Sequence, residues 1–195
     1  MVAPGPSTLF AILTVLVNAA VLIAIFLAVG ARFSNVIREA RDAVWELVGE
    51  TGLFQAWLVA TVCMLGSLYY SQVAHLDPCE LCWFQRICMY PLPLILGIGL
   101  LRRDRAVRYY ALPLATIGGL ISIYHYQLER FPHQSTMCEI ANPCSTVWVW
   151  RFHYISIPFM ALSGFAFIVT ALLIIGRSEP TPFKTEALSD PAASL

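Results

Sequence analysis

The chain has 195 residues, of which 58% are hydrophobic and only 12% are charged, and its formal net charge is zero. A mean hydropathy of +0.70 excludes an average soluble domain and places most of the chain in lipid, which leaves no room for a separate soluble catalytic domain. The zero net charge gives no indication of a nucleic-acid partner.

Five apolar stretches reach the roughly 18 residues that indicate a membrane-spanning helix. In chain order they are residues 8–29, 54–74, 84–101, 109–127 and 155–175. The third contains one arginine, the fourth contains one histidine, and the other three contain no formal charge. The sequence therefore predicts an all-α integral membrane protein whose functional site is built from helix ends and short loops.

Residues 1–52 are predicted to be an appendage to the rest of the chain. The first apolar stretch has no basic region before it and exceeds the usual length of a signal-peptide core, so we expect a retained transmembrane helix rather than a cleaved signal. In residues 31–51, apolar side chains recur at helical spacing and charged side chains fill much of the remainder. We expect an amphipathic helix on the cytoplasmic interface, with a charged connector as the alternative.

Residues 53–176 are predicted to form a four-helix transmembrane bundle. Pro91 and Pro93 lie inside the third apolar stretch and should kink that helix. Residues 177–195 are rich in Pro, Ser, Ala and Thr, and are predicted to be a disordered cytoplasmic tail. The small residues at which bundle helices can approach closely are Gly66, Gly97, Gly99, Gly118 and Gly119.

The basic residues predict the orientation of the chain in the membrane. They follow the first and last apolar stretches and crowd the connection between the third and fourth, whereas loops 75–83 and 128–154 hold only Arg130 and Arg151. By the positive-inside rule these two loops face outward, the N-terminus is outside and the C-terminus is cytoplasmic. The residues behind this assignment are Arg32, Arg38, Arg41, Arg102, Arg103, Arg105, Arg108, Arg177 and Lys184.

Four of the six cysteines lie in the two outward loops, where an oxidising compartment favours pairing. Cys79 and Cys82 form a Cys-x-x-Cys motif, and Cys138 and Cys144 form a second pair. The remaining two lie inside apolar stretches, where we interpret them as small packing residues. They are Cys63 and Cys88.

The residues around the first pair have the order of a helix start. Asp77 is placed to cap the helix, Pro78 suits the first helical position, and Glu80 falls at the third. Cys79 and Cys82 are then expected in the first turn, where free N–H groups and the helix dipole favour a reactive thiolate.

Arg86 lies one turn beyond the Cys-x-x-Cys motif, inside a predicted span. An arginine at the centre of a spanning helix costs at least about 2.5–3.5 kcal/mol, so such residues usually have a function. We interpret Arg86 as a donor to a carbonyl oxygen of an electron acceptor dissolved in the bilayer, with Gln85 as its companion; snorkelling to the headgroups is the alternative. His125, at a similar depth, is either a proton-handling or acceptor-binding residue or a packed histidine.

Two other interpretations of the cysteines remain open. Zinc sites use the same Cys-x-x-Cys spacing, and the second pair can complete a four-cysteine site. Two purely structural disulfides are the third possibility. Arg86 and the lack of a soluble module that needs a metal favour a redox relay, so we assign no metal ligand.

A specific pattern links four segments of the chain. They are residues 66–71 (GSLYYS), 78–86 (PCELCWFQR), 121–126 (ISIYHY) and the second cysteine pair with its neighbours, CEI at 138–140 and PCS at 143–145. In this order, over about residues 54–176, they resemble the DsbB family of disulfide-bond formation proteins, and within it the short-looped BdbC-type branch.

The resemblance implies a four-helix bundle in the bacterial inner membrane. Such a protein reoxidises an exported thioredoxin-fold (DsbA-like) dithiol partner and passes the electrons to a quinone, either ubiquinone or menaquinone. By position, the second cysteine pair matches the partner-facing pair and the first matches the quinone-facing pair, with Cys82 in contact with the quinone. Arg86 matches the family's quinone-site arginine, and His125 matches its quinone-proximal histidine.

Two features depart from the family pattern. The first span and the amphipathic segment have no counterpart in it, and only five residues separate Cys138 from Cys144. A short loop relays over little distance, so we expect the partner to dock close to the membrane. The alternative function is a zinc- or disulfide-stapled membrane scaffold without turnover.

Overall fold

The computed structural model describes residues 4–132, 138 and 143–177, and within these ranges the chain is built from helices. Five helical stretches are long and apolar enough to cross a membrane, which confirms the predicted all-α membrane fold. The elements are α1 (Pro4–Gly30), α2 (Asn35–Leu68), η1 (Tyr69–Val73), α3 (Glu80–Met89), α4 (Pro91–Arg102), η2 (Arg105–Val107), α5 (Arg108–Arg130) and α6 (Ile157–Arg177).

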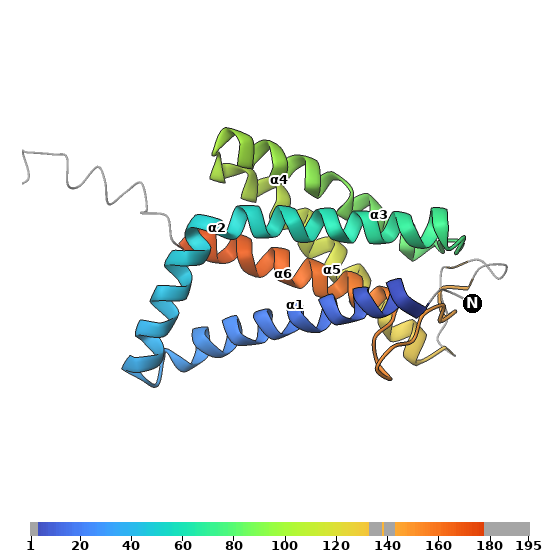
Figure 1. The fold of residues 1–195 in the computed structure, drawn as a ribbon, viewed down its shortest axis with the longest axis horizontal. Coiled ribbons are helices and arrows are strands. Elements are labelled where there is room, and N and C mark those ends of the chain that lie inside the picture. Colours follow the sequence, from blue (N-terminus) through green and yellow to red (C-terminus); the bar gives the residue numbers. More distant parts are fainter. Residues whose placement is uncertain (1–3, 133–137, 139–142, 178–195) are drawn as a thin grey trace, which may run out of the picture.

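The bundle is organised around α6, which packs against α2 and α5, while α4 packs on α2 and α3 packs on α5 (Figure 1). The interior is made of aliphatic and small side chains, so the helices approach closely. Its buried members are Ala56, Ala60, Cys88, Met89, Leu92, Leu96, Val107, Ala111, Ala115, Phe165, Ile168, Ala171, Leu172 and Ile175.

The helix α2 is longer than a membrane crossing. Its 34 residues rise about 50 Å, against a hydrocarbon core of about 30 Å. Figure 1 shows the first part of α2 crossing the end of the bundle and the second part running along it. Val36 and Leu47 on this first part are 75% and 59% exposed, and Phe33, in the turn before it, is 85% exposed. This segment is the predicted amphipathic helix, and its apolar side chains are left uncovered by protein.

The third span is broken where the prolines predicted a kink. The helix α3 ends at Met89, Tyr90 forms a turn, and α4 starts with Pro91. Proline has no N–H for the preceding turn, so its natural place is the first turn of a new helix. The break lets α3 and α4 contact different neighbours, α5 and α2.

The helix α1 packs on the outside of the bundle, against α6 and α2. Figure 1 shows it close to the bundle near its N-terminal end and leaning away toward Gly30. Two hydrogen bonds fix its start, because the Arg151 guanidinium donates to Ser7 Oγ from Nη2 at 2.8 Å and from Nε at 3.2 Å. The start of α1 and the segment after Cys144 therefore share one end of the molecule. Of the predicted tail, only Arg177 lies within the described residues.

Candidate redox site

The Cys-x-x-Cys motif lies at the start of α3, although the helix begins two residues later than the sequence predicted. Cys79 has an extended backbone, with φ −70° and ψ 173°, and is the N-cap residue. The prediction that Asp77 caps this helix is therefore wrong. The extended conformation directs the Cys79 sulfur toward Cys82 and His125, and the helix starts only after it.

The two sulfurs of the motif form a close pair of free thiol groups. Cys79 Sγ lies 3.1 Å from Cys82 Sγ, within hydrogen-bonding distance for sulfur. Cys79 is only 6% exposed, whereas Cys82 is half-buried. The sulfur atoms are therefore close enough to form a bond between them after a small movement.

The surroundings of Cys79 favour its thiolate. The pKa of Cys79 is lowered from 9.0 to about 4, chiefly by the hydrogen bond with Cys82; burial opposes this shift, and a hydrogen bond with His125 contributes to it. The low pKa favours the thiolate on Cys79, and in that state the Cys82 thiol is the donor between the two sulfurs. The N-cap position adds the positive end of the α3 dipole.

His125, on α5, connects the first cysteine pair to the second. Its Nε2 lies 3.6 Å from Cys79 Sγ and 3.1 Å from the Cys144 carbonyl oxygen, and its Nδ1 lies 3.2 Å from Gln85 Nε2. The amide nitrogen of Gln85 can only donate, so Nδ1 accepts and Nε2 carries the hydrogen. The imidazole thus donates toward the Cys144 carbonyl and the Cys79 sulfur.

The second cysteine pair is a disulfide that packs against the first pair. Cys138 and Cys144 are bonded, with their Cα atoms 5.9 Å apart, and Cys144 is 1% exposed. Cys79 and Cys144 share one buried apolar cluster with Leu81 and Leu128, and both Cys82 and Cys138 pack against it. Because Cys138 and Cys144 are bonded to each other, they do not form a four-cysteine zinc site with the first pair.

Arg86 turns inward from α3 rather than toward the headgroups. Its Nε donates to Ser67 Oγ at 3.0 Å and its Nη2 donates to the Ser67 carbonyl oxygen at 3.3 Å. The guanidinium also lies over the Trp83 ring, 5.3 Å from the centroid. The snorkelling alternative is not supported by these contacts, since they hold the charge between α3 and α2.

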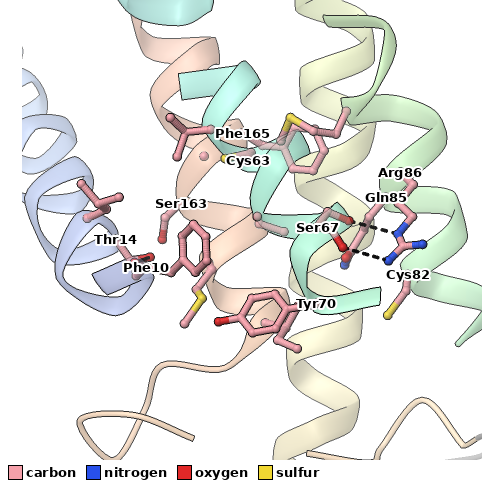
Figure 2. A pocket seen from close by; sticks show the side chains of 18 of the residues that line it. Phe10, Thr14, Cys63, Ser67, Tyr70, Cys82, Gln85, Arg86, Ser163 and Phe165 are labelled. Carbon is pink, nitrogen blue, oxygen red and sulfur yellow. Dashed lines mark hydrogen bonds between the residues drawn. The ribbon is translucent and has the colours of Figure 1, made fainter. Parts of the chain in front are cut away.

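A cavity of about 280 Å³ lies beside Cys82 (Figure 2). Its walls come from α1, α2, η1, α3 and α6 and from the loops at 76–78 and 148, and they are mostly apolar. Near α3 and η1 the polar side chains include Ser67, Tyr70, Cys82, Gln85 and Arg86, and on the opposite side they include Thr14 and Ser163. Tyr70 Oη is buried with no hydrogen-bond partner among the described residues, so it can donate to a ligand.

The structure brings the predicted site residues together in two groups. Cys82, Gln85 and Arg86 line the cavity, whereas Cys79 and His125 lie behind Cys82, next to the second disulfide. The sequence predicted His125 at a similar depth to Arg86, and the structure places it behind Cys82, since no residue of α5 lines the cavity. A position along a helix gives the depth of a residue, and only the rotation of the packed helix decides which neighbour it meets.

Ser67, Tyr70 and Phe10 are among the residues that line the cavity and carried no predicted role. Ser67 and Tyr70 belong to the motif at 66–71, and Phe10 belongs to the N-terminal span. For Ser67 and Tyr70 the available signal was a polar group near the end of an apolar stretch. Phe10 gave no signal, because an aromatic residue in an apolar helix is ordinary.

The same site offers a set of soft metal ligands. One ligand atom each from Cys79, Cys82 and His125 lies within 4.8 Å of the others. Two sulfurs and one imidazole nitrogen are ligands that zinc accepts. Zinc content is therefore a quantity to measure beside any redox activity.

Comparisons with known proteins give a consistent result. The family model described as disulfide bond formation protein DsbB matches residues 50–175, which is more than half of the chain. The disulfide bond formation protein C of Bacillus subtilis (strain 168) is 46% identical over 125 residues, which cover 63% of this chain and 91% of that protein. A probable disulfide formation protein of Coxiella burnetii (strain CbuK_Q154) is 43% identical over 122 residues, which cover 61% of this chain and 83% of that protein. No solved structure matches the chain.

The family match contains both cysteine pairs, Arg86 and His125, and ends before Arg177. It covers all or most of four of the five described helical stretches that can cross a membrane and none of α1, so α1 lies outside the shared unit. The chain is therefore a multi-pass membrane oxidoreductase that forms disulfide bonds, and it belongs to the DsbB family, in the branch of the Bacillus C-type proteins.

Proposed function

We propose that this protein reoxidises an exported thioredoxin-fold dithiol partner and delivers the electrons to a membrane quinone. The observation that carries the proposal is the position of the first cysteine pair between two different surroundings. Cys82 borders the apolar cavity together with Arg86, and Cys79 borders the second disulfide through His125. The pair can therefore exchange with the Cys138–Cys144 disulfide on one side and with a lipid-soluble acceptor on the other.

The cavity fits the chemistry of a quinone. Quinone carbonyl oxygens accept hydrogen bonds, and the donors at this end of the cavity are Arg86, Gln85 and the unpartnered Tyr70 hydroxyl. The remaining walls are apolar, as an isoprenoid chain requires. When bound, a quinone supplies the two-electron acceptor and takes up two protons. Whether the natural acceptor is ubiquinone or menaquinone is decided by binding measurements with each.

The proposed cycle begins at the second pair. A partner thiolate attacks the Cys138–Cys144 disulfide, and the second partner thiol completes the exchange, which leaves the partner oxidised and this pair as a dithiol. That dithiol then reduces the Cys79–Cys82 disulfide and becomes a disulfide again. The arrangement of the sulfurs is compatible with this product, since Cys138 is bonded to Cys144 while Cys79 and Cys82 are unbonded.

The final step re-forms the first disulfide. The Cys79 thiolate bonds to the Cys82 sulfur, the Cys82 thiol releases its proton, and two electrons leave on the cavity side. Over the whole cycle the partner dithiol loses two electrons and two protons. His125 holds the Cys79 thiolate and the Cys144 backbone in one place, and Gln85 orients His125 from the cavity side.

The proposed partner docks near the membrane surface. Cys138 is half-buried, and the chain from Cys144 to Ile155 is tied back by the Arg151–Ile155 backbone pairing, with 2.8 Å between N and O in both directions. A loop restrained in this way does not extend far from the bundle. On the charge pattern, this end of the bundle faces the outside of the cell.

The experiment that tests the proposal is turnover of the purified protein in nanodiscs without oxygen, with a reduced thioredoxin-fold partner and a defined quinone. Cys82→Ser should abolish quinone reduction, and Cys88→Ser is the matched control because Cys88 is a free cysteine outside both the cavity lining and the redox pair. Arg86→Ala should raise the KM for quinone about tenfold, since a charge-assisted hydrogen bond is worth roughly 1.5–3 kcal/mol.

Two outcomes would contradict the proposal. One is normal quinone reduction by both Cys82→Ser and Arg86→Ala, because electrons would then not leave from the start of α3. The other is one zinc per chain with no turnover, which would favour the scaffold alternative and use the ligand set of Cys79, Cys82 and His125.

A further inference from the structure

The N-terminal helix α1 supplies one wall of the cavity beside Cys82. Its lining residues are Phe10, Leu13, Thr14 and Val17, whose i, i+3, i+4 and i+7 spacing places them on one helical face. The Thr14 hydroxyl donates to the Phe10 carbonyl oxygen at 2.8 Å, so its polar group is already used within the helix. This wall is therefore suited to an apolar part of a ligand.

The wall is held firmly against the bundle. Phe10 packs its ring on Tyr69 and Tyr70, with centroids 6.1 and 5.7 Å apart. Gly66 allows this approach, because a Cβ added there would lie 3.1 Å from the Phe10 ring. Ala11, one residue further along α1, is fully buried. Together with the Arg151–Ser7 hydrogen bonds, these contacts fix the first three turns of α1.

The rest of α1 does not share this specialisation. Leu16 is 60% exposed and Phe26 is 64% exposed, as expected for side chains that face lipid. The family match begins at residue 50, so the cavity wall made by α1 lies outside the shared unit. Without α1, the same side of the cavity would be open toward lipid.

We infer that α1 forms a subsite for the isoprenoid tail of the quinone, an inference that rests on the proposed function. Cys82, Gln85 and Arg86 line the cavity from α3, where the ring would be held, whereas the hydroxyls of Thr14 and Ser163 donate to carbonyl oxygens of their own helices. From there the lining continues over apolar residues of α1 and α2 toward Val17 and Leu58. The tail occupies this apolar part, where contacts with protein replace its contacts with bulk lipid. The gain in affinity comes from packing, since lipid is already apolar.

The expected consequence is selectivity for tail length. A quinone with a long isoprenoid chain meets the α1 wall, whereas a quinone ring without a tail meets only the polar end. Loss of an aromatic side chain from the wall should therefore weaken binding of the long-chain quinone and leave binding of the tail-less quinone unchanged. The affinity change should be about fivefold, the order expected from roughly ten lost carbon contacts and no lost hydrogen bond.

The test is equilibrium binding of the two quinones to the full chain in nanodiscs, followed by quenching of tryptophan fluorescence, since Trp148 lines the cavity. Phe10→Ala is compared with Phe26→Ala, which removes the same side chain from the lipid-facing part of α1. Leu13→Ala and Leu16→Ala form a second matched pair that avoids the loss of the Phe10 ring stack. We expect weaker long-chain binding only for the Phe10 and Leu13 variants.

The outcomes separate the two proposals. Equal long-chain affinity in both members of each pair overturns the subsite while leaving the proposed function intact. A wild-type protein that binds neither quinone overturns both. A long-chain quinone with a photoreactive group on its tail gives an independent readout, because it should label the α1 peptide around residues 10–17. Excess phospholipid and excess unlabelled long-chain quinone are each added as competitors. If phospholipid removes the labelling and the quinone does not, the wall holds acyl chains, and the inference is overturned.

Discussion

Cys79 and Cys82 are three residues apart, yet their sulfurs contact different parts of the molecule. Cys79 contacts His125 and belongs to the cluster that contains Cys144, while Cys82 lines the cavity with Arg86. The extended backbone of Cys79 produces this difference, because it places one sulfur before the helix and the other in its first turn. A motif that began inside the helix would direct both sulfurs along one face.

At this scale the first prediction concerns the charge of Cys79. Because its folded pKa, about 4, lies below its ordinary value of 9.0, the fold favours the thiolate. The stabilisation is complete above pH 9, declines between pH 9 and 4, and is absent below about pH 4. The ultraviolet absorbance of the thiolate, taken as the difference between reduced wild type and Cys79→Ser, should persist from pH 8 to pH 5 and disappear near pH 4.

Replacing the donor provides the control for this titration. Cys82→Ala removes the hydrogen bond that contributes most to the shift, whereas Cys82→Ser keeps a hydroxyl donor at that position. The pH midpoint of the thiolate absorbance should rise in Cys82→Ala and stay low in Cys82→Ser. A wild-type midpoint near 9 would show that Cys79 is not the charged sulfur.

The sequence singled out residues that the structure brings close together, but it did not predict how they divide between the cavity and the second disulfide. Both cysteine pairs, Gln85 and Arg86 were identified from residue type and spacing, since an arginine beside a Cys-x-x-Cys motif in an apolar stretch is informative by itself. The helix start at Cys79 and the position of His125 depend on how α3 and α5 pack, and a sequence pattern does not contain the rotation of a helix.

At the scale of elements, contact between α5 and α6 depends on a glycine. A Cβ at Gly118 would overlap the Phe165 ring, which is 1% exposed and enclosed in the bundle core. The adjacent Gly119 is different, because a Cβ there would lie 3.6 Å from Phe165 Cβ, an ordinary contact. Two neighbouring glycines thus have different roles, although the sequence predicted close approach at both.

This difference gives a matched pair of substitutions. Gly118→Ala should lower the free energy of unfolding by about 1–3 kcal/mol, because overpacking a rigid core forces side chains off their preferred rotamers. Gly119→Ala should be neutral or stabilising by up to about 1 kcal/mol, from helix propensity. Thermal unfolding of the purified protein in one detergent measures both. Equal midpoints for the two variants would show that the α5–α6 interface tolerates a methyl group at Gly118.

The predicted number of spanning helices was correct, whereas their ends were not predicted in detail. Hydropathy identifies a span because lipid requires apolar side chains. It does not reveal that α2 continues unbroken from the amphipathic segment into the span, because both parts are helical and differ only in the side chains they present. The π-helical turn η1, which carries Tyr70 into the cavity, has no signal in the apolar pattern.

At the scale of the whole molecule, the two ends of the bundle carry different sets of polar residues. Ser7, Arg151 and both cysteine pairs lie at one end of the bundle. At the other end, Arg105 and Arg177 line a cleft with acidic residues of α2. Figure 1 shows the start of α1 beside the segment before α6, away from the connection between α4 and α5. The basic end is proposed to be cytoplasmic.

This orientation predicts the outcome of a protease experiment. With an epitope tag at each terminus, protease added to intact spheroplasts should remove the N-terminal tag and leave the C-terminal tag protected. Lysed spheroplasts, in which both tags are cleaved, are the control for accessibility. Protection of the N-terminal tag in intact spheroplasts would place the cysteine end in the cytoplasm and contradict the proposed partner.

The position of Cys82 has a consequence for the kind of oxidant that the protein accepts. Cys82 borders a cavity whose walls are largely hydrocarbon, whereas Cys79 is buried on the loop side. Under the proposed function, an oxidant must dissolve in the bilayer before it meets Cys82, so its partition coefficient matters before its reduction potential does. Water-soluble disulfides such as oxidised glutathione then fail to oxidise Cys82 because they do not enter the bilayer, and not because they do not fit the cavity. Under this proposal the protein takes electrons from thiols on the water side and gives them only to acceptors that dissolve in the bilayer.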